Sequence, residues 1–126
     1  MELKDVKFIN KEKKQTFAYI CAVLRDKFTD EIREKKMETT MSVISFLELD
    51  EIDIENAWKF SEDKHIEILK TFTQDEINIL TVSLILVAEA DGLMSKSEKE
   101  FIRNIIAQAG VSFFKLVKMY RTYNLV

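Results

Sequence analysis

Three carboxylates gather in the stretch AEADGLMSKSE, which follows a long apolar run. They belong to Glu89, Asp91 and Glu98, and we call these three residues the acidic corner. Carboxylate oxygens are hard ligands that suit Ca²⁺ or Mg²⁺. If the fold brings the three side chains together, the stretch predicts a site for one divalent cation.

The same residues also have a purely structural interpretation. Ser95 and Glu98 have the spacing of a capping box, in which each side chain accepts a hydrogen bond from the other residue's backbone N–H. Asp91 can hydrogen-bond the backbone of a turn, and Gly92 can supply a positive φ. The sequence leaves both interpretations open.

An EF-hand loop does not fit this stretch. If Gly92 is set at the sixth loop position, Glu98 falls at the twelfth, where an EF-hand has its bidentate glutamate. The first position then falls on Val87, whose side chain cannot bind a cation. A cation at this point therefore requires a looser corner between two helices.

Other residues that could do chemistry are few. His65 is the only histidine, so a zinc site of several histidines is excluded, and we expect it to be exposed near the start of a helix. Cys21 is the only cysteine and lies on an apolar stripe, so we expect it in the core. Because the sequence has no glycine-rich phosphate loop and no nucleophile elbow, it predicts a protein that is not an enzyme.

Length and charge narrow the class of protein. The 126 residues, 47% hydrophobic and 33% charged, predict one domain spanning residues 1–126. The net charge of −3 argues against nucleic acid as a partner. The first 14 residues have acids and lysines where a signal peptide would have an apolar core, so we expect a cytoplasmic protein. The longest apolar run, residues 77–88, is too short to cross a membrane.

The composition predicts an all-α fold, because the chain has no proline and only two glycines to make turns. Apolar spacing predicts a helix over residues 11–28 and a second over 31–48, the latter with its buried stripe on Met37, Met41, Ile44 and Leu47. Later helices are predicted around residues 54–60, after Ser61, after the capping box Thr73–Glu76, from Ser95 to Gly110, and around residues 113–123. The segment Ile77–Ala90 is apolar on nearly every side, which predicts a buried central helix.

A resemblance to a known family lies in the same region. An apolar helix ending in AEADG, then MSKSEKEFI and a close at AQAG, is similar to the tellurite-resistance TerB-like family over residues 72–110. The resemblance implies a multihelical bundle of two pseudo-symmetric three-helix repeats around two central helices. It also implies a cytoplasmic stress-response or membrane-linked setting. In some members it implies a divalent cation, here at Asp91 and Glu98 with Glu89 a weaker neighbour.

The first half of the chain departs from this motif. An offset of 62 residues aligns the apolar positions of the two halves, such as Leu24 with Leu86 and Val43 with Ile105. The same offset sets Lys36 opposite Glu98, so the first half has a cation where a metal ligand is expected. The sequence therefore predicts at most one cation site per chain.

Two functions remain open from the sequence. One is a small helical adaptor or stress-response module that docks a protein partner, with a divalent cation at the acidic corner. The other is a structural protein-interaction module without a metal, which binds through an apolar groove between the repeats. Aromatic side chains that prove to be exposed would mark the partner surface.

Overall fold

A computed structural model describes residues 10–27, 33–90 and 92–126, and these residues form seven helices and no strand. The helices are α1 (Lys11–Lys27), α2 (Arg33–Ser45), α3 (Glu51–Lys59), α4 (Glu62–Leu69), α5 (Gln74–Ala88), α6 (Lys96–Gln108) and α7 (Phe113–Thr122). The predicted all-α multihelical bundle is confirmed. None of the described helices is both long and apolar enough to cross a membrane.

The helix starts follow the capping residues predicted from the sequence. Ser61 caps α4, and complete capping boxes start α5 at Thr73 and α6 at Ser95. Gly110 ends α6 with φ +81°, a conformation that costs glycine little because it has no Cβ.

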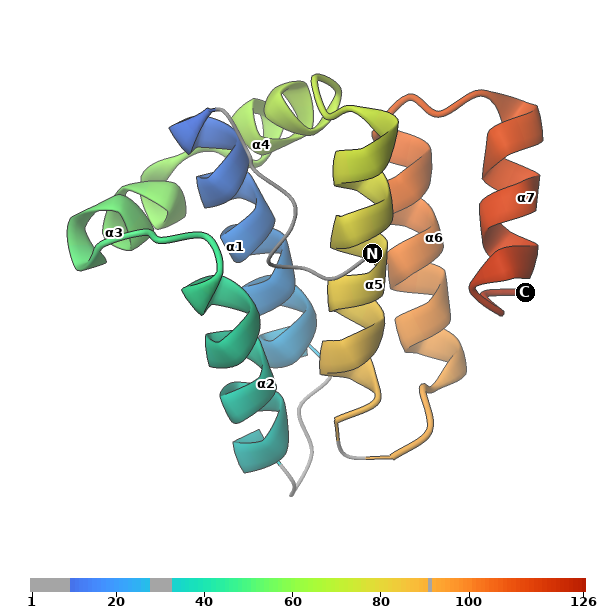
Figure 1. Ribbon diagram of the computed structural model, residues 1–126, viewed down its shortest axis with the longest axis horizontal. Helices are drawn as coiled ribbons and strands as arrows, with labels where there is room; N and C mark the ends of the chain where they lie inside the picture. The colour runs from blue at the N-terminus through green and yellow to red at the C-terminus, as the bar shows by residue number, and fades with distance from the viewer. Residues whose placement is uncertain (1–9, 28–32, 91) are drawn as a thin grey trace.

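Helices α1 and α5 pack side by side at the centre of the bundle (Figure 1). Helix α1 also contacts α2, α3 and α4, while α5 contacts α2 and α6. Helix α7 packs on α6 at the outer edge. The central position therefore belongs to a pair of helices, and α1 is covered by more elements than α5.

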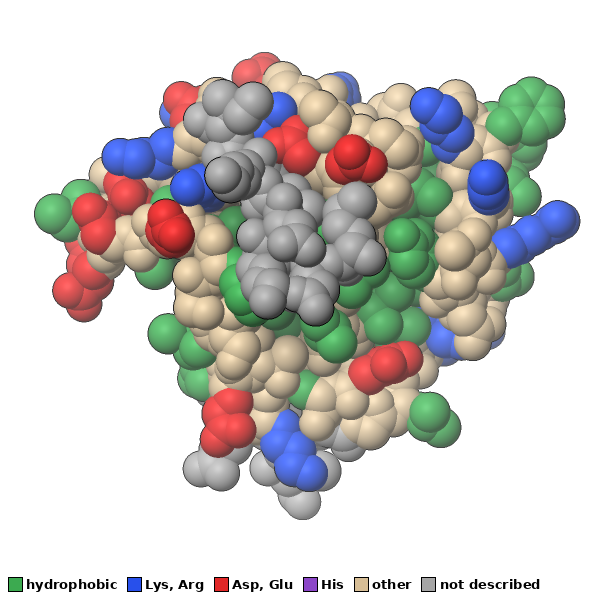
Figure 2. All heavy atoms as spheres, in the orientation of Figure 1, with side chains coloured by type: hydrophobic (Ala, Val, Ile, Leu, Met, Phe, Trp, Pro, Cys, Tyr) green, Lys and Arg blue, Asp and Glu red, His purple; other side chains and the backbone are tan. Residues whose placement is uncertain are grey.

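One side of α5 is open to solvent, contrary to the expectation that it is buried all round. Leu84 and Val87 are fully buried, but Val82 is 36% and Leu86 45% exposed. Figure 2 shows hydrophobic side chains at the surface over α5 and toward α7. The apolar residues on one side of α5 thus form part of the core, and those on its other side form an exposed apolar surface.

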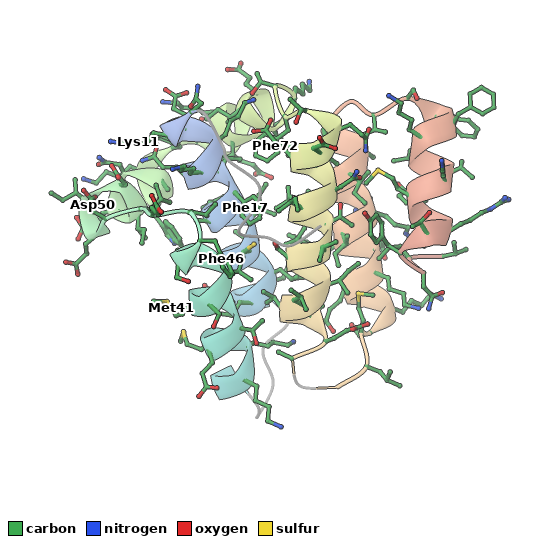
Figure 3. The ribbon with its side chains drawn as sticks, in the orientation of Figure 1. Lys11, Phe17, Met41, Phe46, Asp50 and Phe72 are labelled. Carbon is green, nitrogen blue, oxygen red and sulfur yellow. The ribbon has the colours of Figure 1, made fainter. Side chains whose placement is uncertain are left out.

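Two of the four residues predicted for the buried stripe over residues 31–48 are buried, namely Ile44 and Leu47, and the two methionines are not. Met37 and Met41 are 37% and 57% exposed, and Figure 3 shows Met41 on the side of α2 that points away from the bundle. Lys36 and Thr40 are buried instead, at 2% and 0% exposure. The Thr40 hydroxyl donates to the Lys36 carbonyl at 2.6 Å, which satisfies its buried polar group. The lysine has an ionic partner, described below.

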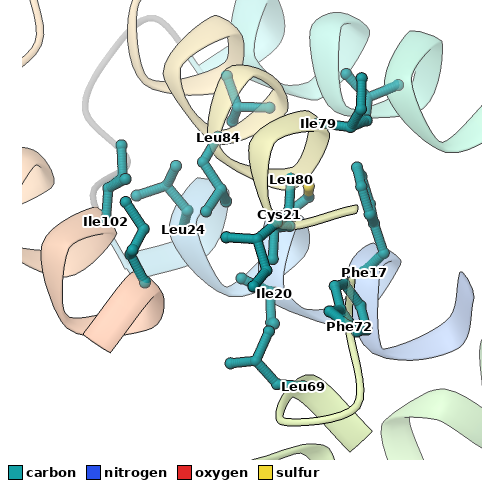
Figure 4. Close-up of a cluster of buried hydrophobic side chains, with 14 of the residues drawn as sticks. Phe17, Ile20, Cys21, Leu24, Leu69, Phe72, Ile79, Leu80, Leu84 and Ile102 are labelled. Atoms are coloured by element: carbon teal, nitrogen blue, oxygen red, sulfur yellow. The ribbon is translucent and has the colours of Figure 1, made fainter. Parts of the chain in front are cut away.

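The core joins both halves of the chain. Figure 4 shows buried side chains of α1 meeting those of α5, α6 and the segment between α4 and α5. The labelled members are Phe17, Ile20, Cys21, Leu24, Leu69, Phe72, Ile79, Leu80, Leu84 and Ile102. Burial of this apolar surface is the main contribution to the stability of the fold. Because the buried residues come from both halves of the chain, neither half has a complete core alone.

The helix bounds agree with the 62-residue offset. Adding 62 to the bounds of α1, α2 and α3 gives 73–89, 95–107 and 113–121, each end within one residue of α5, α6 and α7. The third helices are placed differently, because α3 packs on α1 whereas α7 packs on α6. Agreement in helix order and length fits the predicted pair of repeats, and the duplication itself stays a prediction.

The different burial of two leucines on α5 leads to a stability prediction. Leu84→Ala removes a fully buried side chain and should lower the free energy of unfolding by about 2–5 kcal/mol. Leu86→Ala is the same substitution at a 45% exposed position and should cost less than about 1 kcal/mol. Urea unfolding at one pH measures both, and equal losses would contradict the placement of α5.

Candidate functional site

The acidic corner lies where α5 gives way to α6. Helix α5 ends at Ala88, and Glu89 is its C-cap. The Gly92 N–H donates to the Glu89 carbonyl at 3.1 Å, and the φ of Gly92 is +137°, as the turn interpretation predicts. Asp91 lies outside the described residues.

Glu98 is buried and both of its carboxylate oxygens have partners. Glu98 is only 4% exposed. Oε1 accepts from the Ser95 N–H at 3.0 Å, and the Ser95 Oγ accepts from the Glu98 N–H at 3.1 Å, which completes the capping box. Oε2 lies 3.3 Å from the Lys36 Nζ. The carboxylate is therefore neutralised by a side chain that comes from α2.

The partnership of Lys36 and Glu98 was not expected from the sequence. The offset of 62 aligns Lys36 in the first half with Glu98 in the second half. In that alignment the lysine stands where a cation site in the first half would need a ligand. In the fold they meet, so the lysine enters the corner that contains Glu98. A buried pair of this kind persists because each charge has already lost its water and depends on the other.

Glu89 has a different environment from Glu98, because its side chain is exposed to solvent. Among the described residues, no three His, Cys, Asp or Glu side chains are grouped closely enough to hold a metal ion. A cation at the corner would need Asp91 and would have to compete with the ammonium group of Lys36 for the Glu98 carboxylate. The described residues of this stretch thus fit the interpretation as a helix cap and a turn.

The capping box of α5 has the same arrangement. Glu76 is 6% exposed, and its Oε1 accepts from the Thr73 N–H at 2.8 Å. The same oxygen lies 2.9 Å from the Nζ of Lys13 on α1. Each capping-box glutamate is therefore joined to a lysine from the first half of the chain. The capping boxes could be recognised from the sequence, but their lysine partners could not.

His65 is buried, so the expectation of an exposed histidine is wrong. It is 3% exposed, and its ring stacks on Tyr19 with centroids 3.9 Å apart. Nε2 lies 2.9 Å from the Ala57 carbonyl, which can only accept, so Nε2 carries the proton and Nδ1 accepts from the Thr16 hydroxyl at 2.9 Å. Burial lowers the pKa of His65. Because both nitrogens are used and the neutral ring is favoured, this histidine serves the fold.

Cys21 also belongs to the core, as predicted. It is fully buried, and burial raises the pKa of its thiol to about 12, so the reactive thiolate is scarce at neutral pH. The cysteine and the histidine thus do not form a nucleophile and a base open to a substrate.

A small pocket lies between α1, α4 and α6, where the two halves meet. Its volume is about 100 Å³, and most of its lining is apolar. It is lined by Tyr19, Ile20, Val23, Glu62, His65, Ile66, Leu69, Phe101, Ile105 and Gln108. A space of this size can take a single small apolar group.

The ion pair leads to a prediction for added metal. Because Lys36 already neutralises Glu98, millimolar Ca²⁺ or Mg²⁺ should leave the melting temperature of the protein equal to that in EDTA. Thermal melts of the wild type, Glu98→Gln and the exposed-site control Glu89→Gln measure this. A metal-dependent rise in the wild type that Glu98→Gln abolishes would support the cation interpretation instead.

Comparison of the chain with protein-family models, curated proteins and solved structures gives no match. The TerB-like resemblance accordingly rests on the motif residues alone.

Proposed function

We propose that this protein is a small helical adaptor, without a catalytic role, that docks a protein partner through the outer face of α7. The observation that carries the proposal is the exposure of two adjacent aromatic residues. Phe113 is 74% and Phe114 87% exposed, at the end of α7 that follows α6. Figure 2 shows hydrophobic side chains projecting at this corner of the molecule.

The two rings form one apolar surface. Their centroids are 6.3 Å apart in a T-shaped arrangement, so a partner that touches one ring can cover both. Burying a phenylalanine side chain is favourable by about 1.5–3 kcal/mol. Aromatic side chains are enriched at the centres of protein interfaces for this reason. An isolated helix tip with two such rings therefore favours an interaction surface over a structural role.

A groove extends this surface toward the centre of the bundle. It has a volume of about 280 Å³ and lies between α5 and α7. Gln74 and Asn78 line it from α5, and α7 and its C-cap contribute Lys115, Lys118, Met119, Thr122 and Tyr123. Helix α7 packs on α6 and touches α5 where the Gln74 Nε2 donates to the Met119 Sδ at 3.5 Å, and the groove lies at that contact. A partner seated on the phenylalanines can extend into it beside Lys115.

In this proposal the acidic corner is a structural joint. The support is the buried pair of Glu98 with Lys36, which employs the carboxylate that a cation would need. The stress-response setting that the TerB-like resemblance implies is part of the proposal and has no further support from the geometry. A divalent cation at the corner is the second interpretation, and the metal melts separate the two.

Site-specific crosslinking tests the docking surface. A photoreactive phenylalanine analogue placed at position 113 or 114 in cells should give discrete adducts, because these side chains lie at the interface. The control is position 93, since Leu93 is 96% exposed but lies at the acidic corner. Adducts of equal yield from all three positions, or none from 113 and 114, would contradict the proposal.

A further inference from the structure

We infer that the partner of the α7 surface is a second copy of this chain, which presents its α3, so that the molecules associate head to tail. The inference rests on the proposed docking function of α7 and names the occupant. It is carried by the opposite charges and the exposed apolar residues at the two ends of the molecule.

Helices α3 and α7 lie at opposite ends of the molecule and carry opposite charges. Residues 48–63, which contain α3, have seven acidic residues and one lysine. Residues 111–126, which contain α7, have three basic residues and no acidic one. Figure 1 places α3 and α7 at opposite ends of the longest axis. Figure 2 shows Asp and Glu over α3, with basic side chains beside them, and Lys and Arg over α7. Lys11 of α1 pairs with Asp53 of α3 at 3.3 Å, while Glu51 and Glu55 remain exposed. One molecule therefore offers a surface of each sign to its neighbours.

Each end combines its charges with exposed apolar side chains. On α3, Ile52 is 67% and Trp58 43% exposed, and they share a face with the exposed Glu51 and Glu55. On α7, the exposed face holds Phe114, Lys115, Lys118 and Arg121. Both sets follow the same spacing of i, i+1, i+4 and i+7, which places each on one side of its helix.

The two faces match when the helices run antiparallel. Aligning Glu55 of one copy with Lys118 of the next also sets Glu51 beside Arg121. The same alignment sets Trp58 beside Phe114. Within the part of the chain that the structure describes, none of these four charged residues makes an ion pair, so they are available to a neighbour.

A second copy explains more of the surface than an anionic membrane does. A membrane would attract the lysines and accept the phenylalanines of α7, but it would leave Ile52 and Trp58 uncovered. One head-to-tail contact covers Ile52 and Trp58 of one copy and Phe114 of the next, and it pairs the charges of the two faces. Such a contact uses two different surfaces, so it continues into a ring or a filament as the concentration rises.

Analytical ultracentrifugation of the full chain tests the inference. At low salt the weight-average mass should rise from 14.8 kDa as the concentration is raised, and 0.5 M NaCl should reduce that rise. Glu55→Lys alone and Lys118→Glu alone should each weaken association about tenfold or more, because like charges then face each other. The double variant Glu55→Lys/Lys118→Glu should recover association, which a folding defect would not allow.

The outcomes separate this inference from the docking proposal. A mass that stays at 14.8 kDa at every concentration, or charge variants that associate like the wild type, would overturn self-association. If crosslinking at positions 113 and 114 then still traps a different protein, the docking surface survives without this partner. If the chain stays monomeric and floats with vesicles containing 30% phosphatidylserine, and Lys118→Glu abolishes flotation, the occupant is a membrane and the inference fails.

Discussion

The relative placement of the two halves depends on two lysine to glutamate pairs, one of them buried and one partly buried. Lys36 reaches Glu98 from α2, and Lys13 reaches Glu76 from α1, and in both cases the glutamate also closes a capping box. A buried charge without its partner is strongly unfavourable, so the Lys36–Glu98 pair is stable only when both halves are in place. The starts of α5 and α6 are thus fixed in position by the first half of the chain, and the shared apolar core then fills the space between them.

The interior and the surface of the molecule have different roles. The groups that could do chemistry are used inside: Glu98 pairs with a lysine, His65 makes hydrogen bonds through both nitrogens, and Cys21 is surrounded by the core. The features without an internal explanation are on the outside, where Phe113 and Phe114 project from α7. The two halves differ in their third helix, because α3 packs on α1 whereas α7 packs on α6. The groove lies between α7 and α5, so it is a consequence of this difference. The exposed phenylalanines and the groove are the support for the proposed docking function.

The helices and their ends could be predicted from the sequence because their causes are local. A serine or threonine three residues before a glutamate specifies a capping box, and Gly110 specifies a left-handed residue. The buried face of α2 could not be predicted by counting apolar residues, since Lys36 is buried by a partner 62 residues away while Met41 is exposed. The burial of His65 could not be predicted for the same reason, because it depends on Thr16 and Ala57 in other elements. For the acidic corner, the residues and both interpretations could be read from the sequence, but the ion pair of Lys36 with Glu98 could not.

A double-mutant cycle on Lys36 and Glu98 tests most directly whether the buried pair organises the fold. Lys36→Met keeps much of the side-chain volume, and Glu98→Gln keeps an acceptor for the capping box, so each removes mainly a charge. We predict that each single variant loses about 3–5 kcal/mol of unfolding free energy in urea, and that the double variant loses at least about 1 kcal/mol less than the sum of the two. Losses that simply add, or single variants as stable as the wild type, would contradict the account.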